Sequence, residues 1–259
     1  MWRILSASVV GTSHTKTCTP CQDFNLAQVW SNDSEENVLL CVCADGAGTA
    51  KFSDLASRVS CEVLRQQVIE SLNCGKNLGQ LTNDDIAKWF RSAHAALVGE
   101  SERASIDLRE FATTALVAVV GGTQAIFGQI GDGAIAVDDS RHPVFWPDSG
   151  EYLNTTAFLT DQDFERSLRI TVVEEPINQV ALFTDGLQLL ALNYADQTVH
   201  RPFFDSMFRA MRETDNFDQL RPELFAFLDS VPVNSRTDDD KTLILAQRIT
   251  DEDEPTRAN

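Results

Sequence analysis

Short runs of apolar residues, each bounded by glycine or a polar residue, recur along most of the chain and predict β-strands. They are WRILSASVV (2–10), FNLAQVW (24–30), NVLLCVCA (37–44), TTALVAVVG (113–121), TQAIFGQIG (123–131), GAIAVDD (133–139), RITVVE (169–174), QVALFT (179–184) and TLILAQR (242–248). Several are rich in β-branched residues, which favour extended backbone. Gly121-Gly122 predicts a tight hairpin turn, and Asp132-Gly133 predicts a second hairpin between the runs on either side of it.

Two long segments instead repeat their apolar residues at steps of three and four, which predicts helices. The first begins near Asp54 and has Leu55, Val59, Val63, Leu64 and Val68 on one face, and the second has Ile86, Phe90, Ala93 and Leu97. Thr82 or Asn83 is the predicted N-cap of the second helix. Two later helices are predicted at 203–212 and 217–230, where Pro222 should lie in the first turn or split the helix.

The order of these elements is strands, a helix pair, a strand meander, a second helix pair and a closing strand. Consecutive helices followed by consecutive hairpins differ from alternating βαβ units and favour an α+β fold, with antiparallel sheets covered by helix pairs. No linker or internal repeat divides the chain, so we expect a single domain over 1–250. The polar, acidic segment 251–259 is expected to be a disordered tail.

Composition and charge narrow the possible partners. The chain has 259 residues, of which 43% are apolar, enough for a substantial core. Its formal net charge of −18 argues against nucleic acid or an anionic membrane as a main partner, because both are polyanions. No run is apolar enough to span a bilayer, and the N-terminus resembles a first strand more than a secretion signal. We therefore expect a cytoplasmic protein.

The cysteines allow a zinc interpretation, because Cys18 and Cys21 form C-x-x-C and Cys41 and Cys43 form C-x-C. However, residues two apart in a strand share one face, and a second C-x-x-C is missing. We therefore prefer the interpretation that Cys41 and Cys43 pack in the core as small apolar side chains. Free thiols also suit a reducing cytosol.

Acidic residues stand at the ends of three predicted strands. Asp45 and Asp185 each end an apolar run and precede a glycine, whereas Asp239 and Asp240 precede the last strand. An isolated Asp-Gly is more often a turn than a ligand. If the three strands are neighbours, however, the carboxylates would repel one another and raise each other's pKa. A divalent cation would remove that repulsion, and oxygen-rich ligation suits magnesium or manganese.

Six short motifs then occur in a characteristic order. They are PCQDFN, ADGAG followed by LAS, ATTA, IGDG, FTDGL and DDDKTLIL. In this order, from about Gly11 to Leu245, they resemble the metal-dependent protein phosphatase family (type 2C), and GTSH followed by CQD resembles its compact bacterial branch. The resemblance implies an αββα sandwich, in which two packed antiparallel sheets are flanked by helix pairs, with a dinuclear metal centre at one end.

The resemblance also implies a ligand set for two Mn²⁺ or Mg²⁺ ions and a weaker third. Asp45 would bridge both ions, and the Gly46 carbonyl would bind one of them. Asp185 and Asp239 would hold the other ion. Asp132, together with Asp185, matches the acids that hold the weaker third ion in relatives.

The same resemblance selects between two adjacent acids and gives a role to two further positions. In the family's D-N-x-T pattern the first acid is the ligand, which favours Asp239 over Asp240. Asp23 would be a supporting acid, and Gln22 takes the place of the residue that contacts metal-bound water. Two cations would lower the pKa of a bridging water, and the resulting hydroxide would attack phosphorus in line. Neither a cysteine nor a serine nucleophile is needed.

The chain also departs from the family pattern. Relatives commonly place a phosphate-binding Arg where this chain has Cys18, and Lys16 and His14 are the nearest replacements. Lysine is a point charge that lacks the bidentate fork of arginine. Many eukaryotic relatives have a His directly after Asp-Gly, where this chain has Ala47. His14 could protonate the leaving alkoxide instead, although a lone His near a strand end more often makes a local hydrogen bond.

These features predict a Mn²⁺- or Mg²⁺-dependent phosphatase acting, as a monomer, on phosphoserine and phosphothreonine in proteins that a Ser/Thr kinase has modified. The segment Ser149 to Glu165 takes the place of the family's mobile flap, where substrate selection could reside. One alternative is a non-catalytic module that senses phosphoproteins, which the missing Arg favours and the retained acids disfavour. Another is a hydrolase of small phosphoesters or nucleotides.

Overall fold

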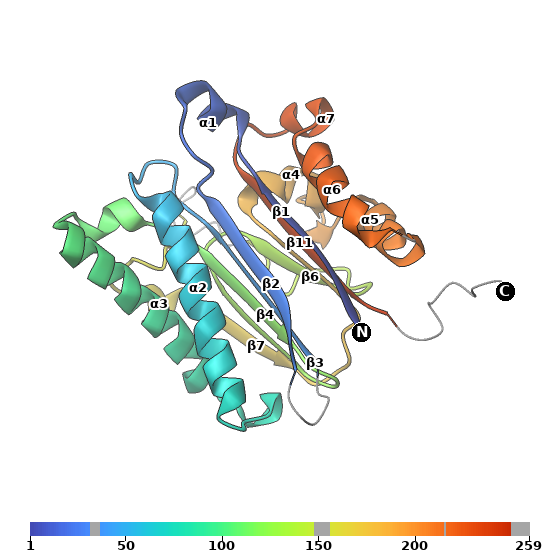
Figure 1. The fold of residues 1–259 in the computed structure, drawn as a ribbon, viewed down its shortest axis with the longest axis horizontal. Helices are drawn as coiled ribbons and strands as arrows, with labels where there is room; N and C mark the ends of the chain where they lie inside the picture. Colours follow the sequence, from blue (N-terminus) through green and yellow to red (C-terminus); the bar gives the residue numbers. More distant parts are fainter. Residues whose placement is uncertain (32–36, 148–155, 215, 250–259) are drawn as a thin grey trace.

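Two antiparallel β-sheets lie face to face at the centre of the protein in the computed structural model, which describes residues 1–31, 37–147, 156–214 and 216–249 (Figure 1). The five-stranded sheet has the order β2 (Asp23–Ser31), β3 (Asn37–Asp45), β4 (Ala115–Val120), β5 (Ala125–Ile130) and β7 (Arg169–Val173). The four-stranded sheet has the order β1 (Trp2–Val9), β11 (Lys241–Arg248), β8 (Gln179–Phe183) and β6 (Ala134–Val137). The predicted two-sheet α+β architecture is therefore confirmed.

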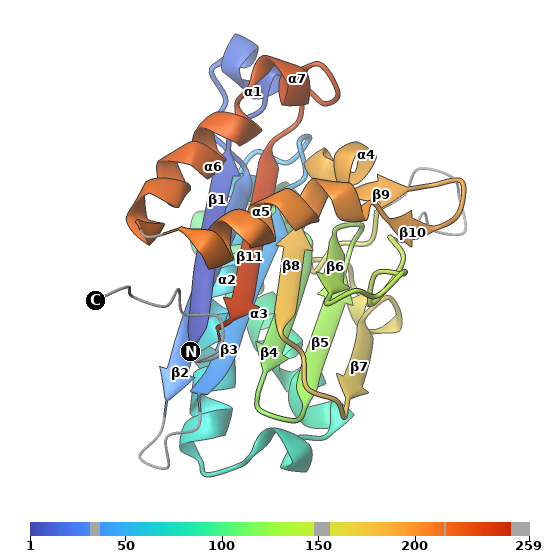
Figure 2. The same ribbon diagram turned by 90° about the vertical axis from the view of Figure 1, so that its right-hand side faces the viewer.

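Helix pairs cover the outer faces of the two sheets and lie on opposite sides of them in Figure 1, and Figure 2 looks onto the four-stranded sheet with its helix pair in front. α2 (Ser53–Asn73) and α3 (Asn83–Ala104) pack on the five-stranded sheet, and α5 (Arg201–Glu213) and α6 (Leu220–Leu228) pack on the four-stranded sheet. Pro222 lies in the first turn of α6, which is one of the two predicted outcomes. Among the described residues, no helix is both long and apolar enough to cross a membrane.

Shorter elements connect these layers. They are the helices α1 (Thr12–Thr17), α4 (Gln188–Ala191) and α7 (Val231–Asn234), the small hairpin of β9 (Leu192–Asn193) and β10 (Thr198–Val199), and the 3₁₀ turns η1 (Leu78–Gln80), η2 (Leu108–Phe111), η3 (Phe164–Arg166), η4 (Asp185–Leu187) and η5 (Phe217–Gln219). Periodicity did not predict them, because each is too short to repeat an apolar position.

The alternation of side chains along β3 explains its apolar run. Val38, Leu40, Val42 and Ala44 pack toward the helices, whereas Leu39, Cys41 and Cys43 pack between the two sheets. Both faces of this central strand are therefore buried, which a continuous apolar sequence requires. Cys41 and Cys43 are fully buried free thiols, so the predicted packing role of these two cysteines is confirmed.

The start of α3 is fixed by a reciprocal cap. The Asp85 N–H donates to the Thr82 hydroxyl over 3.2 Å, and the Asp85 carboxylate accepts from the Thr82 N–H over 3.0 Å. These bonds satisfy backbone groups that the first helical turn leaves unpaired. Of the two caps predicted from the sequence, the structure selects Thr82.

The hairpin predicted at Asp132-Gly133 is wrong. β5 belongs to the five-stranded sheet, whereas β6 pairs with β8 in the four-stranded sheet, so this turn carries the chain from one sheet to the other. Gly131 has a φ of +97°, in the left-handed region that glycine adopts without strain. Apolar runs on both sides of the turn could not show that the two strands belong to different sheets.

The antiparallel order brings the predicted acids to one end of the sandwich. β3 ends at Asp45, and its partner β2 begins at Asp23, directly opposite. In the other sheet β8 ends just before Asp185, and β11 begins just after Asp240. The predicted tail 251–259 and residues 149–155 of the predicted flap lie outside the described residues.

Candidate metal centre

Three carboxylates from distant parts of the chain converge at this end. Asp45, Asp132 and Asp185 each offer one oxygen, and the three oxygens lie within 4.8 Å of one another. Asp45 comes from the end of β3, Asp132 from the turn between β5 and β6, and Asp185 from η4. In the described part of the chain, the His, Cys, Asp and Glu residues form no other such group, and the cysteine motifs are not part of it.

Paired threonines hold the backbone of Asp45 in place. The Asp45 N–H donates to the Thr114 hydroxyl over 2.9 Å, and the Asp45 carbonyl accepts from the Thr113 hydroxyl and the Thr114 N–H. Thr113 and Thr114 are both buried. They act through packing and hydrogen bonds beside the centre.

Gly46, the predicted carbonyl ligand, continues the chain out of β3. Its N–H donates to the Gln22 carbonyl over 3.1 Å, and a Cβ added to Gly46 would lie 2.5 Å from the Ser53 carbonyl oxygen. Only glycine allows the start of α2 to approach this closely. The turn after Asp45 is therefore held between residue 22, just before β2, and the start of α2.

The Asp185 turn packs as tightly against the entrance of β11. A Cβ on Gly186 would overlap the Asp240 carbonyl oxygen, so the absence of a side chain lets η4 lie directly on residue 240. This contact brings Asp185 toward Asp239. The negative charge of Asp239 is in turn among the causes that raise the pKa of Asp185.

Asp23 is a buried acid beside this cluster. Its Oδ2 accepts a hydrogen bond from the Thr184 hydroxyl over 2.7 Å, whereas its buried Oδ1 has no partner among the described residues. Burial raises the pKa of Asp23 to about 8, and the charges of Asp240 and Asp185 add to the effect.

The other acids of the cluster behave in the same way. Burial, and then the charges of Asp23 and Asp185, raise the pKa of Asp45 well above its ordinary value. Burial, and then Asp132 and Asp239, raise the pKa of Asp185 to about 7. Burial is also the largest cause of the raised pKa of Asp132. The common causes are burial, which removes water from each carboxylate, and the negative charge of the neighbouring acids.

These groups fit a hard divalent cation. The donors are all oxygens, which Mg²⁺ and Mn²⁺ prefer. Three buried oxygens, Asp23 Oδ1, Asp185 Oδ1 and Gln22 Oε1, lack a hydrogen-bond partner in the described structure. Buried polar atoms are normally paired, so unpaired acceptors beside clustered acids indicate a place for cations and the water around them.

The two adjacent acids before β11 have different environments. Asp240 is buried, and its carboxylate accepts from the Gly11 N–H and the Gln22 N–H, each over 2.6 Å, while His14 Nδ1 lies 2.9 Å away. Asp239 is exposed, and its charge acts on Asp45, Asp132 and Asp185. The Asp240 oxygens are thus already used by hydrogen bonds. Asp239 is not one of the three acids whose oxygens converge, but it lies close enough for its charge to act on all three.

The two predicted cationic residues lie on α1. His14 has Nδ1 on Asp240, and its Nε2 lies 4.0 Å from the point that a Cβ of Gly48 would occupy. Gln22 Oε1 lies 3.9 Å from the same point. His14 therefore reaches the loop that follows Asp45. Lys16 is exposed and makes no hydrogen bond or ion pair with a described residue.

Further residues support Asp132, and sequence reasoning did not find them. The Gln188 side-chain amide donates to the Asp132 carbonyl over 2.5 Å, and the Tyr194 hydroxyl donates to Gln188 Oε1. The Thr156 hydroxyl donates to Asp132 Oδ2 over 2.7 Å. No sequence motif marks these residues, because each acts through a contact that the tertiary fold creates.

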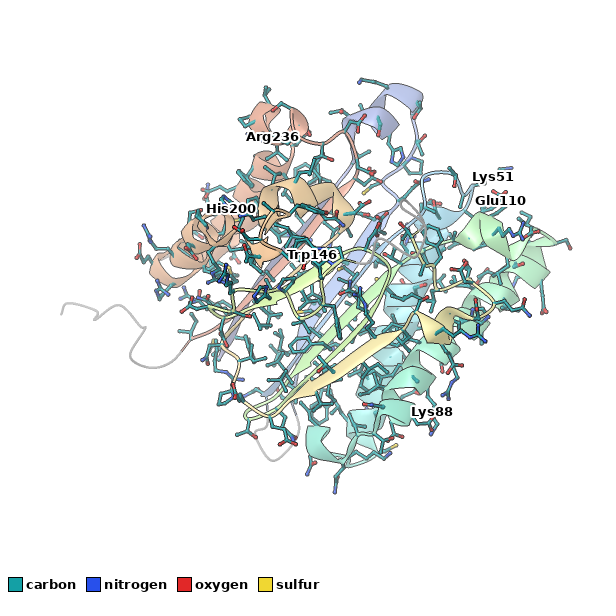
Figure 3. All side chains as sticks on the ribbon, turned by 180° about the vertical axis from the view of Figure 1, so that it is seen from behind. Lys51, Lys88, Glu110, Trp146, His200 and Arg236 are labelled. Carbon is teal, nitrogen blue, oxygen red and sulfur yellow. The ribbon has the colours of Figure 1, made fainter. Side chains whose placement is uncertain are left out.

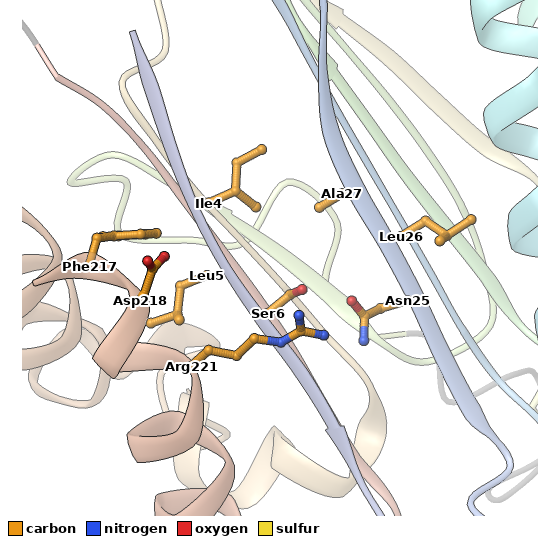
Figure 4. Close-up of a pocket in the computed structure, with 9 residues that line it drawn as sticks. All are labelled: Ile4, Leu5, Ser6, Asn25, Leu26, Ala27, Phe217, Asp218 and Arg221. Carbon is orange, nitrogen blue, oxygen red and sulfur yellow. The ribbon is translucent and has the colours of Figure 1, made fainter.

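A separate cleft of about 390 Å³ lies where β1 and β2 run side by side beneath η5 and α6 (Figure 4). Its polar lining includes Ser6, Asn25, Asp218 and Arg221. None of the predicted site residues line it, so it is distinct from the acidic centre.

Comparison with known proteins identifies the class of fold and then the family. A serine/threonine phosphatase from Staphylococcus aureus superposes with a TM-score of 0.61 at 16% identity, covering 96% of each chain. A serine/threonine phosphatase of Mycobacterium tuberculosis gives 0.60 at 15% identity, covering 96% of this chain and 99% of that one. These identities are low, so the two structures establish the shared fold.

Sequence similarity is more specific. The model of the protein phosphatase 2C family matches residues 10–229. Serine/threonine-protein phosphatase 3 of Escherichia coli (strain K12) is 37% identical over 251 residues, which are 95% of this chain and 98% of that protein. The chain belongs to the protein phosphatase 2C family.

Proposed function

We propose that this protein is a Mn²⁺- or Mg²⁺-dependent phosphatase that hydrolyses phosphoserine and phosphothreonine in proteins. The carrying observation is the convergence of Asp45, Asp132 and Asp185 beside buried oxygens that lack partners. Family membership and the 37% identical E. coli phosphatase support the same conclusion. We further propose that the protein acts as a cytoplasmic monomer on proteins modified by a Ser/Thr kinase.

Each proposed cation would be bound by a different set of these acidic residues. In our proposal Asp45 and the Gly46 carbonyl, with Asp185 and Asp239, hold two ions, and Asp132 with Asp185 holds a weaker third. Bound cations would supply Lewis-acid activation of the attacking water and neutralise charge on the phosphoryl oxygens. The unpaired Asp23 Oδ1 and Gln22 Oε1 are acceptors suited to orienting water at the centre.

His14 is the proposed proton donor. Asp240 accepts from His14 Nδ1, which keeps a proton on that nitrogen and directs Nε2 toward the loop after Asp45. His14 Nε2–H can then donate to the leaving alkoxide oxygen, which is a poor leaving group without a proton.

The leaving group gives a direct test of this role. p-Nitrophenolate leaves readily without a proton, whereas the serine alkoxide does not. We expect His14→Ala to lower kcat on a phosphoserine peptide by about 100-fold and kcat on p-nitrophenyl phosphate by only a few-fold. Equal losses on both substrates would contradict proton donation by His14.

Lys16 is proposed to attract the substrate phosphate rather than to bind it in a fixed geometry. It is exposed near His14 on α1, and its ammonium group has no partner among the described residues. A flexible point charge of this kind raises the rate of encounter with an anion.

The whole proposal is tested by phosphate release from phosphoserine and phosphothreonine peptides with Mn²⁺, Mg²⁺ or EDTA. We expect metal-dependent turnover, and we expect Asp45→Asn to reduce it by at least about 100-fold. Peptide binding without turnover would support the sensing module instead. Faster turnover of nucleotides than of phosphopeptides would support the small-phosphoester hydrolase.

A further inference from the structure

A second cleft adjoins the acidic centre. It has a volume of about 490 Å³ and lies between the loop that follows Asp45-Gly46, the 3₁₀ turn η2 and residues 158–162. Ala47 and Thr49 line one side, and Arg109 and Thr160 line others. The segment that forms its third wall begins just after Thr156, whose hydroxyl holds Asp132. The cleft therefore extends outward directly beside the proposed reaction site.

Arg109 is positioned in this cleft by a short chain of backbone hydrogen bonds. The Arg109 carbonyl accepts from the Ala112 N–H over 3.2 Å, and the Ala112 carbonyl accepts from the Ala47 N–H over 3.0 Å. Only two hydrogen bonds thus separate the backbone of Arg109 from the loop after Asp45. Arg109 therefore projects from a defined point beside the centre.

A second set of bonds ties η2 to the start of α2. The Glu110 carbonyl accepts from the Phe52 N–H over 2.8 Å, and the Glu110 carboxylate accepts from the Lys51 N–H over 2.9 Å. Figure 3 labels Lys51 and Glu110 next to each other at this end of the molecule. These bonds hold η2, which carries Arg109, against the start of α2. A binding residue needs a fixed support of this kind.

The charges of the cleft leave Arg109 available to a ligand. Asp107 accepts from the Arg109 N–H over 2.9 Å, and Asp161 accepts from the Phe158 N–H over 2.8 Å, so each acid caps a backbone turn. The Arg109 side chain is exposed and makes no hydrogen bond or ion pair with a described residue. The chain has a net charge of −18, but at this place beside the proposed reaction site it offers a positively charged guanidinium with which a ligand can pair.

We infer that this cleft binds the substrate segment next to the phosphorylated residue, and that Arg109 pairs there with an anionic side chain of the substrate. The anion is a carboxylate or a second phosphate, since the planar guanidinium bonds to either in a bidentate manner. A volume of about 490 Å³ is in the range of sites that hold small ligands or side chains. This inference rests on the proposed phosphatase function.

The test is kcat/KM on phosphoserine peptides that differ at one flanking position, which carries Glu, Ala or Lys in turn. Each position close to the phosphoserine is scanned on both sides. We expect wild type to prefer Glu at one of these positions by about tenfold, as one charge-assisted hydrogen bond would give. Arg109→Ala should abolish the preference while leaving the Ala peptide and p-nitrophenyl phosphate unchanged. Arg109→Glu should reverse it in favour of Lys.

Arg221→Ala is the matched control, because Arg221 is also exposed but lines the remote cleft of Figure 4. It should retain the wild-type preference. The inference is overturned if wild type is indifferent to the flanking charge, or if Arg109→Ala slows p-nitrophenyl phosphate as much as the Glu peptide. The latter result would place Arg109 on the scissile phosphate.

Failure of the proposed function has a different outcome. If no peptide is turned over, binding of the same labelled phosphopeptides is measured by fluorescence anisotropy. Tighter binding of the Glu peptide to wild type, lost in Arg109→Ala, would still support the cleft. Equal binding of the Glu and Ala peptides to wild type would overturn it.

Discussion

Asp23 and Asp45 face each other directly across the antiparallel β2–β3 pair, with Asp132 and Asp185 near the same end of the sandwich. Like charges at opposed strand positions destabilise a sheet, and here Asp23 is buried and Asp45 is half-buried. The fold therefore holds an arrangement that is unfavourable by itself and that the proposed cations would stabilise.

Without metal, stability should fall as pH rises. The folded protein has raised pKa values for Asp23, about 8, and Asp185, about 7, against an ordinary value of 3.8. Between about pH 4 and pH 8 the folded state thus binds more protons than the unfolded state, and rising pH favours unfolding. Thermal unfolding in EDTA should give a lower Tm at about pH 8 than at about pH 5.

Metal should reverse this trend, because cations bind the ionised acids of the folded state. Added Mn²⁺ should raise the Tm more at the higher pH. Asp45→Asn, which removes one of the opposed charges, should show both a smaller pH effect and a smaller response to Mn²⁺. A metal-free Tm that rises from about pH 5 to about pH 8 would contradict the proposed burial of these acids.

Gly186 should not tolerate a side chain. Gly186→Ala places a methyl group against the Asp240 carbonyl oxygen, so η4 must move away from β11 and carry Asp185 with it. We expect a loss of about 1–3 kcal/mol in the free energy of unfolding together with loss of phosphatase activity. Chemical denaturation and phosphate release measure the two effects.

Gly122→Ala is the control for this substitution. A Cβ on Gly122 would meet nothing within 4 Å, and Gly122 lies at the β4–β5 turn. Stability and activity should both stay close to wild type. If Gly186→Ala behaves in the same way, the close packing of η4 on residue 240 is not needed for the centre.

Tyr194 should influence cation binding although it is no ligand in the proposal. Tyr194→Phe removes the hydroxyl that orients the Gln188 amide, which in turn holds the Asp132 carbonyl. Supporting residues of this kind change metal affinity by about 10–100-fold. We expect about tenfold weaker binding of the weakest Mn²⁺ ion, measured by calorimetry and by the Tm as a function of Mn²⁺ concentration.

Leu189→Ala provides the comparison, because Leu189 is 66% exposed and lies next to Gln188 on α4. Mn²⁺ binding should be unchanged in this variant. Equal weakening in the two variants would indicate a general effect on α4 instead of the hydrogen bond from Tyr194.

Lys16→Ala should raise KM for a phosphopeptide a few-fold at low ionic strength and leave kcat unchanged. An exposed charge changes the rate at which enzyme and anionic peptide associate more than it changes the chemical step. At 0.1 M salt its effect is screened beyond about 10 Å. The difference from wild type should therefore shrink as salt is added. Lys88→Ala is the control, since Lys88 already pairs with Asp84 on α3. A large loss of kcat in Lys16→Ala would instead give Lys16 a fixed place in the site.

The sequence alone determined where most strands and helices lie and which acidic residues stand at their ends. Alternation of buried side chains in β3, and steps of three and four in α3, are local properties that a strand or helix must satisfy to bury one or both faces. For the same reason Asp45 and Asp185 could be placed at the ends of apolar runs. The order of the short motifs then predicted the family and the two-sheet fold.

The tertiary structure alone decided which of these ends meet and what supports them. At Asp132 the chain passes from one sheet to the other, where the sequence predicted a hairpin. His14 forms its hydrogen bond with the buried Asp240. The fold also brings Tyr194 and Arg109 to the edges of the centre. A sequence pattern reports how strongly each side chain prefers burial, but the partner of a buried group is chosen by packing between segments that are far apart in the chain.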